Sequence, residues 1–424
     1  MSADNKVPEI RFKGFSREWQ ENYLGNLIEI RSAARVHKEQ WTEVGVPFFR
    51  TSDVVSIYKG QENNKAYISH AVYQELSEKI GKVTKGDLFI TGGGSIGIPY
   101  LVPNDEPLYF KDADLLWLKN NKKFDGYFLY SFFFSEAFKK YIKSITHIGT
   151  IAHYTIEQAK VTPINICEIK EQIAISNYLK KINNLINQHQ QKHDKLSNIK
   201  KAMLEKMFPK QGETEPEIRF KGFSGEWERK QLDELCSLIT KQTGFDYSAT
   251  IKPSLVRKKN RKTYSFIQNK DFNGPNINLE TDFFIPCNIA DKFPRILIDT
   301  PSILISISGK IGNVGFYQLS EKSLVGGAVG ICKLRCASDG LVIVHQLLSS
   351  IGQMHFQALT KSSSHANITV EDIRLITVNL PSTIEEKNKI GKYFNQLDTL
   401  INQHQQQITK LNNIKQACLS KMFV

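Results

Sequence analysis

Two long stretches of the chain carry apolar residues at alternating steps of four and three, the spacing that lines one face of an α-helix. They cover residues 169–208 and 383–423. The pattern predicts two helices with seams of about 33 residues, or roughly 50 Å at 1.5 Å per residue. We expect pairing through Ile175, Leu179, Ile182, Ile186, His189 and Leu196 on the first seam and Ile390, Phe394, Leu397, Ile401, His404 and Leu411 on the second.

Two equal seams in one chain most simply bury each other, as the helices of a coiled coil do. The pseudo-twofold relation between the halves favours an antiparallel pair, which would hold one globular body at each end of a rod. His189 and His404 fall near the middle of the two seams. Two histidines without a carboxylate or cysteine beside them make a poor metal site, so we interpret them as polar core positions that set the register.

The two segments before these helices, about residues 20–168 and 228–382, carry shorter patterns. In both, an apolar run with the length of a buried strand continues into a glycine turn, after residues 86–91 and 301–306. Each segment also contains an apolar helix candidate, at residues 127–141 and 341–359. The mixture predicts an α/β (α+β) fold with two tandem globular bodies.

The expected boundaries follow from these patterns and from the proline- and glycine-containing break between the halves. They are a first body over 1–168 with a leading segment at 8–22, a helix over 169–209, a linker over 210–215, a second body over 216–382 and a helix over 383–424.

Short sequences at the ends of the bodies occur twice. PEIRFKGFS runs over residues 8–16 and again over 216–224, and LINQHQQ runs over 185–191 and again over 400–406. The offset grows from 208 residues at the first echo to 215 at the second, so the second body is seven residues longer. Constant ends around diverged middles indicate a fixed frame that carries two different reading surfaces.

The charge of the chain favours a nucleic-acid partner. The formal net charge is +13 and the isoelectric point about 9.2, and cationic proteins gain affinity for nucleic acid by releasing condensed counterions. The six cysteines are scattered without CxxC spacing, which fits a reducing cytoplasm and predicts no metal site. We see neither a secretory signal nor an apolar run of about 20 residues.

The sequence contains no complete motif of a catalytic or cofactor-binding site. Residues 92–97 fit G-x-G-x-x-G, but the prolines that follow, Pro99 and Pro103, would not start the helix that a dinucleotide site needs. A phosphate-binding loop of the G-x-x-x-x-G-K-[ST] type and an amino-methyltransferase N/D-P-P-Y/F motif are both missing from the sequence. Glu168 and Lys170 fit the E-x-K fragment of nucleases, but Thr383 and Glu385 replace them in the second copy. We therefore predict a binding protein with no catalytic residues.

Three places suit contact with DNA, although each could also be an ordinary solvated loop or turn. The first is a cationic cluster that would grip phosphates: Arg257, Lys258, Lys259, Arg261 and Lys262. The second is a polar loop before the last strand of each body, with His147, Thr150 and His153 in one copy and Lys361, Ser362, Ser363, Ser364 and His365 in the other. The third is the glycine turn, with Thr91, Ser95, Ser306, Ser308 and Lys310; Arg50 and Thr51 are weaker candidates.

The combination of motifs resembles the DNA-specificity subunit of type I restriction–modification systems. It includes the leading segment PEIRFKGFSREW, the S/G-x-I-G turn, and a motif that leads into each long helix, TPI with EQI at 162–173 and NLP with EKN at 379–388. The resemblance covers nearly the whole chain, twice and in the same order.

The resemblance implies two target-recognition domains that each read one half of a split, asymmetric DNA sequence. The two helices would set the spacer between the half-sites and dock two methyltransferase subunits. The partners would bind S-adenosylmethionine and methylate adenine, motor-endonuclease subunits using ATP and Mg²⁺ would join them, and this chain would need no cofactor. The alternatives are an enzyme with its own methyltransferase or nuclease activity and a coiled-coil scaffold that does not touch nucleic acid.

Overall fold

The chain folds as two compact units. The computed structural model describes residues 6–111, 114–120, 122–145, 153–272, 274–318, 321–360 and 367–424. The first unit joins Met1–His189 to Gln406–Val424, and the second covers Gln190–Gln405. Each unit therefore contains one body, the beginning of one long helix and the end of the other.

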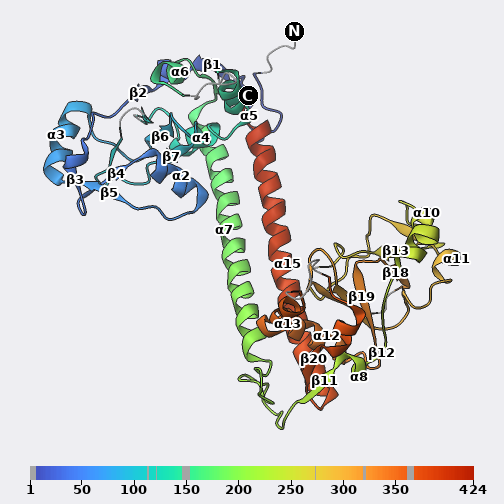
Figure 1. Cartoon of the computed structure of the whole chain (residues 1–424). Helices are drawn as coiled ribbons and strands as arrows, with labels where there is room; N and C mark the ends of the chain where they lie inside the picture. The colour runs from blue at the N-terminus through green and yellow to red at the C-terminus, as the bar shows by residue number, and fades with distance from the viewer. Residues whose placement is uncertain are drawn as a thin grey trace. The chain divides into compact units, whose positions relative to one another are not determined.

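The first body combines short strands with short helices (Figure 1). Its strands are β1 Gln20–Tyr23, β2 Glu29–Arg31, β3 Trp41–Thr42, β4 Val46–Phe49, β5 Ala66–Ile68, β6 Leu88–Thr91, β7 Pro99–Leu101, β8 Tyr109–Phe110, β9 Leu115–Lys119 and β10 Pro163–Ile166. Its helices are α1 Leu24–Leu27, α2 Thr51–Lys59, α3 His70–Ile80, α4 Gly126–Phe132, α5 Glu136–Ile145 and α6 Ile156–Lys160, with a 3₁₀ turn at Lys38–Gln40. The long helix α7, Ile169–Lys206, follows.

The second body has the same kinds of elements. Its strands are β11 Glu228–Gln231, β12 Cys236–Lys241, β13 Thr263–Ile267, β14 Phe284–Pro286, β15 Leu297–Ile298, β16 Ser302–Ser306, β17 Val314–Tyr317, β18 Ser323–Val325, β19 Val329–Leu334 and β20 Thr377–Leu380. Its helices are α8 Leu232–Leu235, α9 Gly244–Asp246, a π-turn at Tyr247–Ile251, α10 Lys252–Ser254, α11 Cys287–Ala290, α12 Asp339–Leu348, α13 Ser350–Thr360 and α14 Val370–Leu375. The long helix α15, Ile384–Lys421, follows.

Each body contains two four-stranded sheets and one two-stranded ribbon. An antiparallel sheet has the order β2-β9-β6-β7 in the first body and β12-β19-β16-β17 in the second. A second sheet, β3-β5-β4-β8 or β14-β13-β18-β15, contains one parallel pair, β4 with β8 or β13 with β18. A two-stranded ribbon, β1 with β10 or β11 with β20, pairs the first and last strands of each body. The second sheets differ in their fourth strand, because β3 is added beside β5 in the first body whereas β15 is added beside β18 in the second. The predicted α+β class is confirmed.

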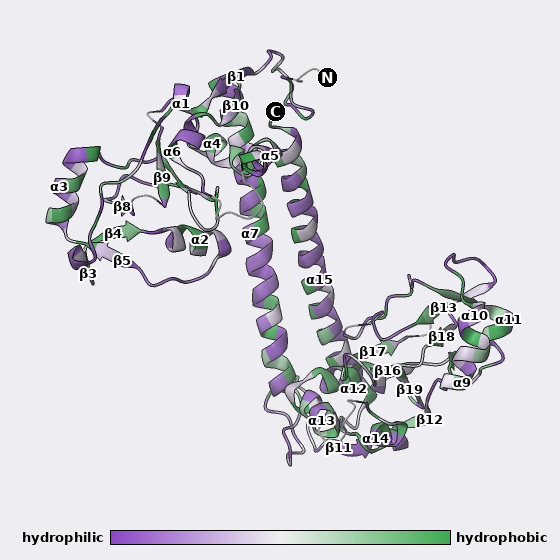
Figure 2. Ribbon diagram, turned by 45° about the horizontal axis from the view of Figure 1, so that its top comes forward, coloured by the Kyte–Doolittle hydropathy of each residue, from purple (hydrophilic) through white to green (hydrophobic). Residues whose placement is uncertain are grey.

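The predicted strands and long helices are present. Residues 86–91 and 301–306 form β6 and β16, whose side chains are all buried. The helices α7 and α15 are 38 residues each and end two residues before the predicted limits. Figure 2 shows the contrast in composition, with mostly hydrophilic residues along α7 and α15 and hydrophobic residues in the central strands of the bodies.

The two apolar helix candidates are each broken in two, which corrects the expectation of single helices. Residues 127–141 lie in α4 and α5, and residues 341–359 lie in α12 and α13. A buried serine stands at each break. The hydroxyl of Ser135 accepts from the N–H of Phe138, and that of Ser349 accepts from the N–H of Gly352, both at 3.3 Å. These bonds satisfy N–H groups of a new first turn, so each serine starts a second helix.

The two long helices pair in antiparallel fashion within each unit. In the first unit Ile175, Leu179 and Ile182, from the beginning of α7, share a core with Cys418, near the end of α15, and with Met422, which follows that helix. The second unit shows the reverse arrangement, because Leu204, near the end of α7, and Met207, which follows it, pack with Ile390, Phe394 and Leu397 near the beginning of α15. The predicted pairing of the two helices is confirmed, and their ends also pack against the body of each unit.

Burial is deepest at the ends of the seam. Ile186, His189 and Leu196 of α7 and Ile401, His404 and Leu411 of α15 are only half-buried. An ion pair between Lys200 and Asp398, 2.5 Å long, lies within the second unit. The helix ends are thus part of two globular cores, and the middle of the seam is a thinner contact.

The leading segment of the first unit is clamped to both long helices. The guanidinium of Arg11 donates two hydrogen bonds, of 2.7 and 2.8 Å, to the carboxylate of Glu171 in the first turn of α7. These hydrogen bonds raise the pKa of Arg11. One residue earlier, the N–H of Ile10 donates to the carbonyl of Lys421, the last residue of α15, at 3.0 Å.

The second unit repeats this clamp with equivalent residues. Arg219 donates two hydrogen bonds of 2.8 Å to Glu386 in the first turn of α15. The N–H of Ile218 donates to the carbonyl of Lys206, the last residue of α7, at 2.8 Å. Each leading segment therefore ties the beginning of its own long helix to the end of the helix from the other copy.

Other contacts between the leading segments, the two long helices and the residues just after each helix also occur once in each unit. We call these parts of the chain the frame. They are the ion pairs Glu9–Lys421 (2.9 Å) and Glu217–Lys206 (2.7 Å), the edge-to-face rings Phe12–Tyr178 (5.7 Å) and Phe220–Tyr393 (5.8 Å), and the edge-to-face rings Trp19–Phe423 (6.3 Å) and Trp227–Phe208 (6.1 Å). These three pairs of contacts therefore recur in both units.

One buried histidine in the second unit gives the fold a pH dependence. His345, in α12, has no exposed surface and stacks on Phe394 of α15 with 4.9 Å between ring centres. Neither ring nitrogen has a hydrogen-bond partner among the described residues. Burial, aided by the charge of Lys200, lowers the pKa of His345 to about 3. The folded state therefore holds this ring neutral where the unfolded chain protonates it.

We expect His345→Leu to flatten the acid side of the stability curve. The folded pKa lies below the unfolded value of about 6.5, so wild-type stability is complete above pH 6.5 and falls toward pH 3 by up to about 1.4 kcal/mol per pH unit. The leucine variant lacks this loss, so its melting temperature should rise relative to wild type as pH falls from 7 to 5. The exposed His70→Gln is the control, and an unchanged difference at both pH values would contradict the assignment.

Candidate nucleic-acid interface

The glycine turns that follow β6 and β16 have the same backbone conformation in both units. Gly94 and Gly97 have φ of +69° and +78°, and Gly309 and Gly312 have φ of +75° and +86°. Residues with side chains rarely adopt these angles. The turn closes when the N–H of Gly97 donates to the carbonyl of Thr91 at 2.8 Å, and Gly312 bonds to Ser306 in the same way at 3.3 Å.

Two of the predicted contact residues in these turns face inward, which corrects their assignment as exposed DNA contacts. Thr91 and Ser306 have no exposed surface. The hydroxyl of Thr91 donates to the carbonyl of Ser95 and accepts from the N–H of Ile98, and the hydroxyl of Ser306 donates to the carbonyl of Ser308. Their hydroxyls hold the turn together, because a buried polar group must find a partner inside the protein.

The tips of the turns remain available. Ser95 and Lys310 are exposed and Ser308 is half-buried. The side-chain amide of Asn269, at the end of β13, donates to the carbonyl of Ser308 at 3.1 Å and so anchors the second turn. Lys310 therefore lies on a turn whose position is fixed by the hydrogen bond from Asn269.

The described residues that follow each predicted polar loop lie beside these turns. In the first unit the N–H of Tyr154 donates to the carbonyl of Gly92 at 2.8 Å, and in the second the N–H of Ile368 donates to the carbonyl of Ile307 at 3.0 Å. His153 is exposed, and a Cβ on Gly93 would lie 3.7 Å from its Nδ1. In the first body, the glycine turn and His153 of the predicted polar loop therefore lie at one edge. The other predicted loop residues, His147, Thr150, Lys361, Ser362, Ser363, Ser364 and His365, lie outside the described residues.

The cationic cluster forms an exposed turn between α10 and β13. Backbone N–H groups bond to side chains of the turn, from Asn260 to Thr263 Oγ1 and from Lys262 to Asn260 Oδ1, at 2.9 and 2.8 Å. The charges are not equivalent, because Lys259 pairs with Glu321 at 2.9 Å and Arg257 lies over the ring of Phe283. Among the described residues no ion pair neutralises the three remaining cations, Lys258, Arg261 and Lys262.

The side chains of Arg50 and Thr51, at the start of α2, form contacts within the first body. Arg50 forms a bidentate ion pair with Asp53, at 2.9 and 3.2 Å, and lies over the ring of Trp41. The hydroxyl of Thr51 donates to the carbonyl of Asp114 at 3.3 Å. Their polar groups are therefore used within the first body, which weakens both as DNA contacts.

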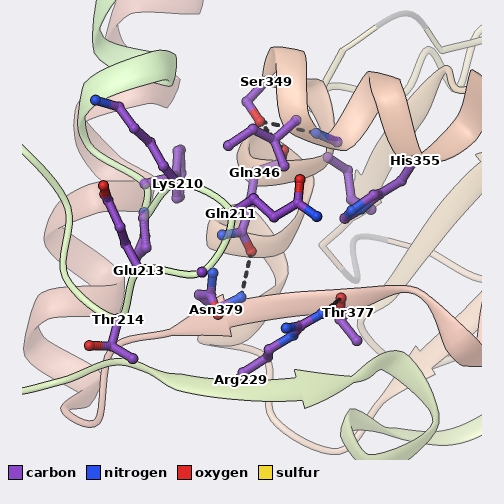
Figure 3. Close-up of a pocket in the computed structure, with 16 residues that line it drawn as sticks. Lys210, Gln211, Glu213, Thr214, Arg229, Gln346, Ser349, His355, Thr377 and Asn379 are labelled. Atoms are coloured by element: carbon purple, nitrogen blue, oxygen red, sulfur yellow. Dashed lines mark hydrogen bonds between the residues drawn. The ribbon is translucent and has the colours of Figure 1, made fainter.

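A small polar pocket lies where the linker passes over the second body (Figure 3). Its lining includes Lys210, Gln211 and Glu213 of the linker and Arg229 and His355 of the body. Its volume is about 160 Å³, below the roughly 300–1,000 Å³ of small-molecule sites. We interpret it as a gap left by the crossing linker.

Sequence reasoning missed two groups of residues. The clamp residues Arg11 and Arg219 stand inside the repeated PEIRF segment, so the repeat could have identified them. Gln242, which follows β12, is buried with neither side-chain amide atom hydrogen-bonded among the described residues. A lone glutamine in a diverged body gives no sequence signal.

The family of this chain is decided by a match that spans both copies. The model of the type I restriction modification DNA specificity domain matches residues 16–198 and 224–413. This chain belongs to that family. As a type I specificity subunit, it serves the recognition of a DNA sequence, and specificity subunits are the non-catalytic components of restriction–modification complexes.

Individual relatives agree with the family match. A putative type I restriction enzyme specificity subunit of Haemophilus influenzae is 30% identical over 166 residues, which is 39% of this chain and 40% of that protein. The putative MjaX specificity subunit of Methanocaldococcus jannaschii is 23% identical over 399 residues, 91% of this chain and 88% of that one.

Solved structures of the same kind share the fold of this specificity subunit. The crystal structure of the type I S subunit from M. genitalium has a TM-score of 0.59 at 15% identity and covers 99% of both chains. A chain in a structure on complex assembly of the type I system has a TM-score of 0.50 at 16% identity, over 95% of this chain and 96% of that one. In the described part of the specificity subunit, every helix is too short or too polar to cross a membrane.

We expect the triple variant Lys258→Ala, Arg261→Ala, Lys262→Ala to weaken DNA binding for all sequences alike. Phosphate contacts give affinity without sequence choice, and each lost contact lowers the slope of log K against log salt by about 0.9. The slope should therefore fall by up to about 3, as measured by fluorescence anisotropy between 50 and 200 mM salt.

The matched control is Lys270→Ala, whose ammonium group is already paired with Asp282 in the same body. It should leave the salt slope nearly unchanged. A triple variant that alters target preference while nonspecific affinity holds would show that these cations read bases.

Proposed function

We propose that this specificity subunit reads a split, asymmetric DNA sequence, with one body at each half-site, and that partner subunits carry out all catalysis. The observation that carries the proposal is the contrast between frame and bodies. The clamps Arg11–Glu171 and Arg219–Glu386 repeat within 0.1 Å, while the residues at the tips of the glycine turns differ. Equal supports with unequal surfaces suit two different half-sites.

The DNA-facing surface of each body would be the edge that carries the tip of the glycine turn. In the first body this edge presents Ser95 and His153, and in the second it presents Lys310. Hydroxyl, imidazole and ammonium groups can bond to base edges or phosphates. The free cations of the 257–262 turn would add affinity to the second body without adding sequence choice.

The long helices would set the distance between half-sites. A helix of 38 residues is roughly 57 Å long at 1.5 Å per residue. This length corresponds to between one and two turns of B-DNA at about 34–36 Å per turn. A spacer defined by protein helices would stay constant when the bodies change.

The two equal frame surfaces would dock two copies of a methyltransferase subunit, and motor-endonuclease subunits would join that complex. Apolar residues are exposed at equivalent places of both units, namely Ile10 (41%) and Ile218 (37%), and Ile169 (46%) and Ile384 (55%). Exposed apolar residues that recur in symmetry-related positions suit one partner binding twice. The partners would supply S-adenosylmethionine, ATP and Mg²⁺, and the complex would act on DNA in the cytoplasm.

We expect the purified chain to bind DNA but to transfer no methyl group. Incubated with duplex DNA and labelled S-adenosylmethionine, it should give salt-dependent binding and no label on the DNA. Addition of the methyltransferase subunit should label a target made of two defined parts separated by a fixed gap. Label incorporated without partners would indicate an enzyme, and binding that is flat between 50 and 200 mM salt would favour a scaffold.

We expect Ile169→Glu and Ile384→Glu each to remove one methyltransferase subunit from the complex. A buried charge without a partner opposes docking, while an acidic residue in the first turn suits the helix itself. Native mass spectrometry should show one bound partner for each single variant and none for the double variant. Val161→Glu and Leu375→Glu, on exposed apolar residues of the bodies, are the matched controls. Full occupancy in the double variant would place the docking surface elsewhere.

A further inference from the structure

Gln242 of the second body has a buried side-chain amide beside a cavity. It follows β12 and its side chain is 4% exposed, yet neither Nε2 nor Oε1 has a hydrogen-bond partner among the described residues. An amide left in this state costs free energy, so native proteins rarely keep one without a role. The amide of Gln242 therefore gains two hydrogen bonds if a ligand offers a matching donor and acceptor.

A cavity of about 610 Å³ adjoins this side chain. It lies where β12 and β13 end and β19 begins, and its lining includes Gln242, Tyr247, Phe266 and Gly327. The rings of Tyr247 and Phe266, which line the cavity, are stacked nearly parallel at 12°. A Cβ at residue 327 would lie 3.2 Å from Oε1 of Gln242, so the glycine leaves the space beside the amide open.

The cavity belongs to the edge already assigned to DNA. Its residue Ala328 accepts a hydrogen bond at 3.0 Å from the N–H of Ile307, in the strand that carries the second glycine turn. Asn269, next to the cavity residue Gln268, holds the carbonyl of Ser308 in the same turn. Lys241 at the cavity and Lys310 on the turn are both exposed, and two cations there suit neighbouring phosphates.

We infer that Gln242 determines specificity for one adenine in the half-site of the second body, an inference that rests on the proposed function. The amide of glutamine can accept from N6 and donate to N7 of adenine in the major groove, a pairing that other bases do not offer. On DNA binding, the amide turns outward from its unpartnered position, through the cavity, to meet this base edge in the groove. A wrong base leaves the buried amide unpaired, which penalises that sequence.

The test combines the full chain with its methyltransferase partner and reads the methylated motif in genomic DNA. Wild type should give a two-part motif with an adenine in the half-site of the second body, and Gln242→Leu should relax that position alone. Gln357→Leu, an exposed glutamine of α13, is the control and should keep the motif. Absence of any two-part motif with wild type would refute the proposed function, whereas an unchanged motif with Gln242→Leu would refute only this inference.

A binding experiment gives a second readout. Each adenine of the half-site is replaced in turn by 7-deazaadenine, which lacks the N7 acceptor. At one position wild type should lose about tenfold in affinity, and Gln242→Leu should be insensitive. Gln242→Leu should also melt no lower than wild type, because it removes an unpaired amide from the interior. A lower melting temperature with wild-type discrimination would make Gln242 a structural residue and overturn the inference.

Discussion

The ion pair between a leading segment and the first turn of a long helix is the contact on which this architecture depends. Arg11 with Glu171, and Arg219 with Glu386, fix where each helix begins relative to the strand that enters its body. The carboxylates are almost fully buried, so the loss of either arginine would leave a charge inside the protein without compensation. Because the neighbouring backbone groups of Ile10 and Ile218 bond to the end of the other helix, one short segment also sets the antiparallel register.

This arrangement separates what must stay constant from what can change. The frame is held together by contacts among the ribbon strands, the clamps and the helix ends. The body between β1 and β10, or between β11 and β20, forms separate sheets of its own. A buried ion pair adds little net stability but specifies geometry, which is the property a duplicated docking surface requires. Two bodies whose lengths differ by seven residues can therefore be held by the same frame contacts.

The frame was predictable from the sequence because it is periodic and repeated. The heptad-like seam gave both helices, and the echoes located both leading segments. The seam also predicted helix-on-helix packing, but the ends bury Ile175 and Phe394 in whole cores, since the first and last turns also face a body. The sequence did not predict the helix breaks at Ser135 and Ser349. A serine within an apolar run does not by itself indicate a helix start, and the hydrogen bond from the N–H three residues later is seen only in the structure.

The candidate site was predictable only in part. Glycines at fixed spacing located the turns, but burial reversed the roles of Thr91 and Ser306, whose hydroxyls bond inside the turn rather than outside it. Composition alone made the 257–262 cluster uniformly cationic, whereas Glu321 neutralises Lys259 from a distant segment. The open space beside the Gln242 amide depends on Gly327, which is 85 positions away in the sequence. Only the fold of the sheets brings these two residues together.

The central claim is that two unlike bodies on one antiparallel frame read two unlike half-sites. The most direct measurement replaces residues 228–382 by residues 20–167, so that both supports carry the first body, and then reads the methylated motif made with the partner subunits. The account predicts that the asymmetric target becomes two inverted copies of one half-site with a similar spacer. A motif that stays asymmetric, or that repeats the half-site in the same direction, would contradict it.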